Sequence, residues 1–166
     1  MRELLVVSAA ALLAAAAFMG SGGRAPALVA DPVRTPGVVN PEVTQETIGS
    51  TICRDGWTRT IRPPTNYTAD LKLKQMREYG VTGSPSQFQE DHLISLELGG
   101  HPTDPRNLWP EPIERAERVD KIENDLNAKV CSGELTLAEA SRPGASAPTP
   151  VAGPLRASTR PSRPWR

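Results

Sequence analysis

The chain has 166 residues, enough for one ordinary domain, and its 19 basic and 19 acidic residues give a formal net charge of zero. The balance is uneven: residues 31–141 hold 12 basic and 18 acidic side chains, a net charge of −6, whereas residues 142–166 hold five arginines and no acid. A protein that coats nucleic acid through bulk positive charge is therefore not expected, and any nucleic-acid chemistry would need a metal ion and local basic patches.

Residues 1–30 have the layout of a secretory signal peptide. A basic start at Arg2 precedes an apolar run from Leu4 to Met19, and small residues follow as far as Ala27 and Ala30, either of which fits a cleavage site. The alternative is a retained membrane anchor, but the 16-residue run is shorter than the roughly 20 residues that span a bilayer. We therefore expect an exported protein, periplasmic or secreted, with no membrane attachment after cleavage.

The two cysteines, Cys53 and Cys131, lie 78 positions apart. In the oxidising compartment that export implies, a lone pair of cysteines predicts one disulfide bond. The alternatives are two free thiols or half of a zinc site, and the chain lacks the paired Cys-x-x-Cys spacing that zinc sites favour.

Three elements are expected in the first half of the exported chain. The prolines of residues 31–50 indicate an extended arm. The alternation of residue types over 52–62 predicts a short hairpin that ends at Pro63-Pro64. A helix is expected over about 69–79, with Thr68 as its N-cap.

The second half predicts two extended pieces followed by helices. Residues 88–98 are compatible with a strand, Gly99-Gly100 with a loop, and 107–109 with a second short extended segment. A long amphipathic helix is expected over about 113–130, and a short helix over 135–140. The positions of the long helix that keep a helical period and are predicted to face inward are Ala116, Val119, Ile122, Leu126 and Val130.

Most acidic side chains in this half are expected to face solvent. Glu90 and Glu97 are predicted to be surface charges, and Trp109 a core residue. The residues expected on a solvated helix face, balanced by Arg115, Arg118 and Lys121, are Glu111, Glu114, Glu117, Asp120 and Glu123.

Three segments result from this division of the chain. Residues 1–30 are the predicted signal peptide, and residues 31–141 the predicted folded domain. Residues 142–166 are rich in Pro, Arg and Ser, with six prolines in 25 residues, and cannot bury enough apolar surface to order themselves. They are therefore predicted to form a disordered basic tail.

The order of polar residues in the middle of the chain suits a one-metal nuclease site. A histidine at a strand end, here His92, can take a proton from water. The acidic neighbour Asp91 can hold a divalent cation against a phosphate, and the helix over 113–130 can supply another oxygen ligand. The alternative is that Asp91 and His92 form a buried pair with a purely structural role.

The segment DHLISLELGG followed by NLWP resembles the motif of HNH endonucleases, in which Asp-His is followed by Gly-Gly and then Asn-Leu. A wider frame over roughly 31–141 resembles small exported bacterial proteins of HNH-like type. The resemblance implies an α+β fold with a small ββα-metal core of a hairpin and a helix, flanked by further helices. The matching residues are Asp91-His92, Leu96, Gly99-Gly100 and Asn107-Leu108.

The resemblance also assigns roles. His92 would be the general base, Asp91 a metal ligand, and Asn107 the residue that orients the ring of His92. The last motif position falls on Ala116, which cannot bind a metal, so Asp120 and Asn124 are the candidate distal ligands. These hard oxygen ligands suit Mg²⁺ or Mn²⁺ better than zinc.

Two functions follow as expectations. The first is an exported metal-dependent nuclease that acts on nucleic acid, DNA or RNA, with DNA the favoured substrate. The second is a non-catalytic binding module of the cell envelope, braced by its disulfide on a degenerate HNH scaffold. Arg59 and Arg62 lie in a basic stretch that could line a phosphate path or be an ordinary surface bias, and the oligomeric state is left open.

Overall fold

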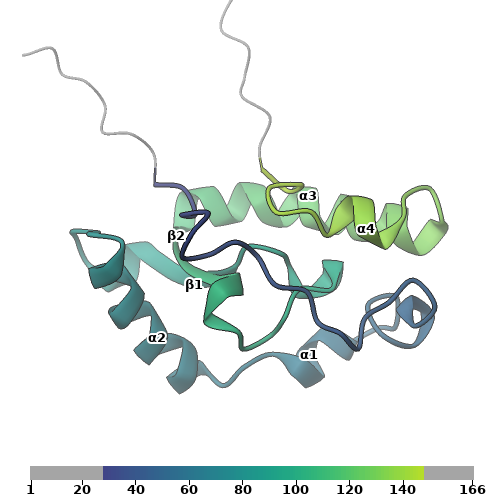
Figure 1. Cartoon of the computed structure of the whole chain (residues 1–166), viewed down its shortest axis with the longest axis horizontal. Helices are drawn as coiled ribbons and strands as arrows, with labels where there is room; N and C mark the ends of the chain where they lie inside the picture. The colour runs from purple at the N-terminus through teal and green to yellow at the C-terminus, as the bar shows by residue number, and fades with distance from the viewer. Residues whose placement is uncertain (1–27, 148–166) are drawn as a thin grey trace, which may run out of the picture.

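The structure is a computed structural model and describes residues 28–147. Within this range the chain has an α+β fold with a two-stranded antiparallel sheet, four α-helices and one disulfide bond (Figure 1). The predicted signal peptide up to residue 27 and the predicted tail from residue 148 lie outside the described residues. The elements in chain order are α1 (Trp57–Ile61), α2 (Thr65–Glu78), β1 (Phe88–His92), β2 (Leu108–Pro112), α3 (Ile113–Ser132) and α4 (Leu137–Ala140).

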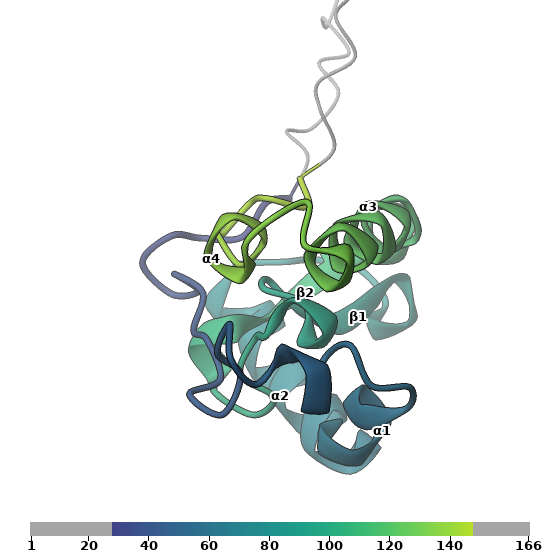
Figure 2. The ribbon, with the colours of Figure 1, turned by 90° about the vertical axis from the view of Figure 1, so that its right-hand side faces the viewer.

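The sheet lies between two helical layers. In both views α3 and α4 lie on one side of the β1–β2 hairpin, and α1 and α2 lie on the other (Figures 1 and 2). Both α2 and α3 contact both strands. Across the ladder Asp91 is opposite Trp109 and His92 is opposite Leu108. The strand pairing therefore places Asp91 and His92 at the end of the sheet from which the connecting loop leaves.

The predicted strand over 88–98 is correct only in its first part. The chain leaves the sheet after His92, and Leu96–Leu98 form a single 3-10 turn in which both leucines are buried. The turn is possible because the backbone at Gly100 comes back against the backbone of Ile94. A Cβ atom at position 100 would lie 1.7 Å from the carbonyl oxygen of Ile94. Only glycine fits at that position.

The predicted hairpin over 52–62 is wrong. Turns occupy this segment as far as Gly56, and α1 follows. Trp57 and Ile61 are four residues apart and both half-buried, which is the spacing of one helical face. In α1, Trp57 packs against the core. An isolated two-stranded hairpin at this place would be only marginally stable, because no third strand covers it.

The other helices match the sequence more closely. The long helix and the short helix that follows it are confirmed as α3 and α4, with bounds that differ by a few residues. The helix predicted over 69–79 begins four residues earlier, directly after Pro64, so Thr68 is not its N-cap. Proline is well tolerated at a helix start, where a backbone N–H is not needed.

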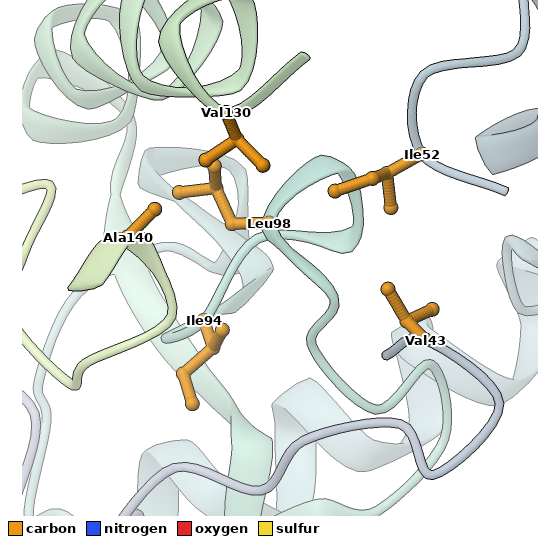
Figure 3. Close-up of a cluster of buried hydrophobic side chains, with 6 residues drawn as sticks. All are labelled: Val43, Ile52, Ile94, Leu98, Val130 and Ala140. Carbon is orange, nitrogen blue, oxygen red and sulfur yellow. The ribbon is translucent and has the colours of Figure 1, made fainter. Parts of the chain in front are cut away.

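A small core holds the two helical layers and the loops together. Its buried side chains come from the N-terminal arm, the loop after β1, α3 and α4, as Figure 3 shows. Cys53 packs against this core and forms the predicted disulfide with Cys131, with 5.5 Å between the two Cα atoms. The bond therefore joins the arm to the end of α3. The core residues are Val43, Ile52, Ile94, Leu98, Val130 and Ala140.

The folded part extends beyond the predicted boundary at residue 141. The hydroxyl of Ser141, the last residue of the predicted domain, donates to the carbonyl oxygen of Leu98, and Ser146 beyond it is buried. Part of the segment 142–147 is therefore packed against the domain, and most of its residues are exposed. Among the described residues, no helix combines the length and the apolar character needed to cross a membrane.

Candidate active site

Five of the predicted site residues line one cavity of about 340 Å³ between α1, β1, the Leu96–Leu98 turn and α3. They are Arg62, Asp91, His92, Asp120 and Asn124. Glu97 and Glu123 line it as well, and Arg62 is its one cationic residue. We call this the acidic cavity. The fold thus brings together residues that lie up to 62 positions apart in the sequence.

His92 is held as a neutral imidazole with a defined tautomer. Its side chain is buried, with 8% of the residue exposed, and Nε2 lies 2.9 Å from the carbonyl oxygen of Pro102. A carbonyl oxygen only accepts hydrogen bonds, so Nε2 carries the proton and Nδ1 keeps its lone pair. Burial lowers the pKa of His92 most strongly, which favours the uncharged ring. The side chain can therefore accept a proton at Nδ1.

Asp91 is fixed beside His92 by two hydrogen bonds. Its Oδ1 accepts from the backbone N–H of His92 at 2.8 Å, and its Oδ2 accepts from Nε2 of Gln89 at 2.6 Å. Both donors are neutral, so the negative charge of Asp91 is oriented without being neutralised. A carboxylate held in this way is suited to bind a cation in the acidic cavity.

Glu123 belongs to the acidic cavity, and its expected place on a solvated face is wrong. The residue is 8% exposed, and burial followed by the charge of Asp91 raises its pKa to about 7. The sequence pattern already indicated this position. Glu123 lies in the series Ala116, Val119, Glu123, Leu126 and Val130, whose members are alternately three and four residues apart, as on one face of a helix. Ile122, which was predicted to face inward, is only half-buried.

The carboxylates of the acidic cavity crowd one another. Burial and then the charge of Asp120 raise the pKa of Glu97, and burial and then the charge of Asp91 raise the pKa of Asp120. The nearby positive charge of Arg62 opposes both shifts. Negative charge is therefore concentrated here beyond what this arginine compensates, which favours a bound cation.

Two further acids near the site were expected at the surface, but Glu111 is fully buried, and Glu90 is half-buried with its carboxyl oxygens covered. Glu111 is 1% exposed and pairs with Arg115, whose guanidinium lies over the ring of Trp109 at 5.2 Å from its centroid. Burial and then the charge of Asp91 raise the pKa of Glu111 to about 8. Burial likewise raises the pKa of Glu90 to about 8, and both of its carboxyl oxygens are covered without a hydrogen-bond partner. Trp109 is fully buried, as predicted.

Asn107 does not orient the ring of His92, contrary to the sequence-based expectation. Its side chain is fully buried and binds the backbone of the loop instead. Oδ1 accepts from the N–H groups of Ile94 at 3.0 Å and Val38 at 3.3 Å. Nδ2 donates to the carbonyl oxygens of Ile94 at 3.0 Å and His101 at 3.1 Å. Asn107 therefore fixes the loop, and the carbonyl of Pro102 in that loop sets the tautomer of His92.

The donor set fits an open, hydrated ion better than a closed metal cage. In the described part of the chain, no group of three or more His, Cys, Asp or Glu side chains is placed to hold a metal ion. Mg²⁺ and Mn²⁺ do not need such a group, since hard cations of this kind often keep several waters and use one or two carboxylates together with a substrate phosphate. Asp91 and the carboxylates of α3 provide that kind of donor.

The two arginines of the predicted phosphate path differ in position. Arg62 lines the acidic cavity and also a second cavity of about 350 Å³ on the α2 side. Arg59 lines neither of these cavities and lies against Gly56. Of this predicted pair, only Arg62 is placed to contact a ligand beside His92.

Comparison of the chain with protein-family models, with curated proteins and with solved structures finds no match.

Proposed function

We propose that this protein is a metal-dependent nuclease that hydrolyses phosphodiester bonds of nucleic acid, DNA in preference to RNA, with His92 as its general base. One observation carries the proposal. A neutral histidine with its proton fixed on Nε2 lies in the same cavity as an oriented aspartate and the carboxylates of a facing helix. A purely structural Asp-His pair would not need a cavity or the crowded carboxylates around it.

In this mechanism His92 accepts a proton at Nδ1 from a water molecule that attacks the phosphate. Donation from Nε2 to the carbonyl of Pro102 holds the ring in place and stabilises the imidazolium that forms. Arg62 lies across the cavity and contributes positive charge toward the phosphate as its negative charge increases.

A divalent cation, Mg²⁺ or Mn²⁺, would polarise the phosphate and stabilise the charge that develops on its oxygens. Asp91 would hold it from β1, and Glu123 and Asp120 from α3. Asn124 is the remaining candidate on this helix, and its Nδ2 donates to the carbonyl of Asp120, so that only its Oδ1 is available as a ligand. On α3, Glu123 is the favoured distal ligand because it is buried and lines the cavity, whereas Asn124 lines the cavity but is exposed.

The order of elements supports an HNH-like site. β1 with Asp91 and His92, the glycine loop, β2 and then α3 follow one another as the ββα-metal arrangement requires. The disulfide would take the place of the structural zinc that other members of the family use as a brace. HNH endonucleases usually carry a proline at the motif position that Ser95 occupies here, and the 3-10 turn after Ser95 forms without it.

The metal site can be tested by calorimetric titration of the mature protein with Mn²⁺. Asp91→Asn and Glu123→Gln should each weaken binding by about tenfold or more, because each removes one negative charge from a hydrated ion with few protein ligands. Glu114→Gln makes the same charge change on an exposed part of α3 outside the cavity and should leave the affinity unchanged. Equal affinities in all three variants, or no binding by the wild type, would favour the non-catalytic binding module.

A further inference from the structure

The second cavity, which we call the α2 cavity, adjoins the acidic cavity and differs from it in charge. The two share Arg62, Gln89, Asp91 and His92 as lining residues. The rest of the α2 cavity is lined largely by Lys72 and by the first turn of α2 with its Thr65 and Thr68 hydroxyls. A ligand bound at His92 can therefore extend directly from one cavity into the other.

The first turn of α2 presents backbone N–H groups that no side chain caps. The helix has 14 residues, no acid in its first turn, and a proline at the N-cap that provides no side-chain acceptor for the first N–H groups. These N–H groups and the helix dipole favour an anion. His92, nine-tenths buried and with no hydrogen-bond partner at Nδ1 among the described residues, also lines this cavity, so the helix start opens onto the proposed reacting group.

Two cationic side chains add to the helix start. Arg62 precedes α2 by three positions and lies where the cavities meet. The ammonium group of Lys72 is fixed by donation to the carbonyl oxygens of Pro85 at 3.0 Å and Phe88 at 2.9 Å. The acids of this lining are Asp91, assigned above to the cation, and Glu90, whose carboxyl oxygens are covered by protein.

We infer that the α2 cavity binds the phosphodiester group that neighbours the scissile one on the same strand. This inference rests on the proposed function. A nucleic-acid strand carries one phosphate for each nucleotide, so a strand whose scissile phosphate lies at His92 must place another negative charge one nucleotide away. The acidic cavity disfavours that charge and the α2 cavity favours it, which also sets the direction in which the strand leaves the site.

The test compares Thr65→Glu with Thr65→Gln, both in a His92→Ala background so that the ligand stays intact. The side chains have nearly the same size, and an acid in the first turn favours the helix, so Thr65→Glu should melt no lower than its control. The ligands are the thymidine dinucleotide TpT, the trinucleotide TpTpT with one more internal phosphodiester, and TpT carrying a terminal phosphate. Binding is measured with Mn²⁺ by competition against a fluorescent oligonucleotide.

With the Thr65→Gln protein, TpTpT should bind about tenfold more tightly than TpT, in line with the 1–3 charge-assisted hydrogen bonds that a phosphate forms at such a site. With Thr65→Glu this gain should largely disappear. An equal gain in both variants, or a gain that only the terminal phosphate produces, would overturn the inference. If the wild type cleaves DNA but the variants do not differ, this inference alone fails. If they differ but the wild type does not cleave, the proposed function alone fails.

Discussion

Replacement of His92 by alanine is expected to slow phosphodiester cleavage by about 10²–10⁴-fold, the usual effect of removing one positioned base. The affinity for Mn²⁺ should stay close to that of the wild type, because neither ring nitrogen is assigned to the metal. Nε2 donates to the carbonyl of Pro102, and Nδ1 accepts the proton from the attacking water. Initial rates on a small phosphodiester, together with calorimetric titration of Mn²⁺, measure the two effects separately.

A second variant distinguishes the loss of the base from disturbance of the loop. His92→Gln retains an N–H donor near the position of Nε2 for the carbonyl of Pro102 but has no nitrogen that accepts a proton near neutral pH. It should be as inactive as His92→Ala and should melt closer to the wild type. Loss of Mn²⁺ binding in both variants would show that His92 is a metal ligand, and the proposed roles would then be wrong.

Removal of the disulfide is expected to have the largest effect on stability. The bond closes a loop with a sequence separation of 78, which corresponds to about 4 kcal/mol in the chain-entropy model. The core that it braces is small, so little other packing can compensate for the loss. Chemical unfolding of the Cys53→Ala/Cys131→Ala double variant, followed by circular dichroism, should show this decrease in the free energy of unfolding.

The wild type treated with a reducing agent serves as the control for this measurement. It should unfold at nearly the same denaturant concentration as the double variant, because both lack the cross-link. The two proteins differ only in the volume of the side chains at positions 53 and 131. A double variant as stable as the oxidised wild type would mean that the arm and the end of α3 are held together by packing alone.

The sequence predicts the parts of the fold that depend on local pattern. The repeat of apolar residues over 113–130 defines α3, because a long amphipathic stripe has one obvious secondary structure. The segment 52–62 carries two periods at once, because its residue types alternate as in a strand while Trp57 and Ile61 have the spacing of one helical face. Tertiary packing of Trp57 against the core decides between them, and no local pattern shows that contact.

The candidate site shows the same division. The proximity of Asp91 and His92 to α3 was predictable from the order of motifs. The position of Glu123 was readable from its three-and-four spacing but conflicted with the rule that acids face solvent. The bonds of Asn107 could not be foreseen, because they depend on the path of a loop that brings together the backbone of residues 38, 94 and 101.

The most direct test of the account is the relaxation of supercoiled plasmid DNA by the purified protein. With Mn²⁺ or Mg²⁺ the wild type should convert the plasmid to nicked circles, and excess chelator should stop the reaction. His92→Gln prepared in parallel should leave the plasmid supercoiled over the same period, which excludes a contaminating nuclease as the source of activity. Nicking at equal rates by both proteins, or no nicking by the wild type with either metal, would contradict the assignment of His92 as the base of a metal-dependent nuclease.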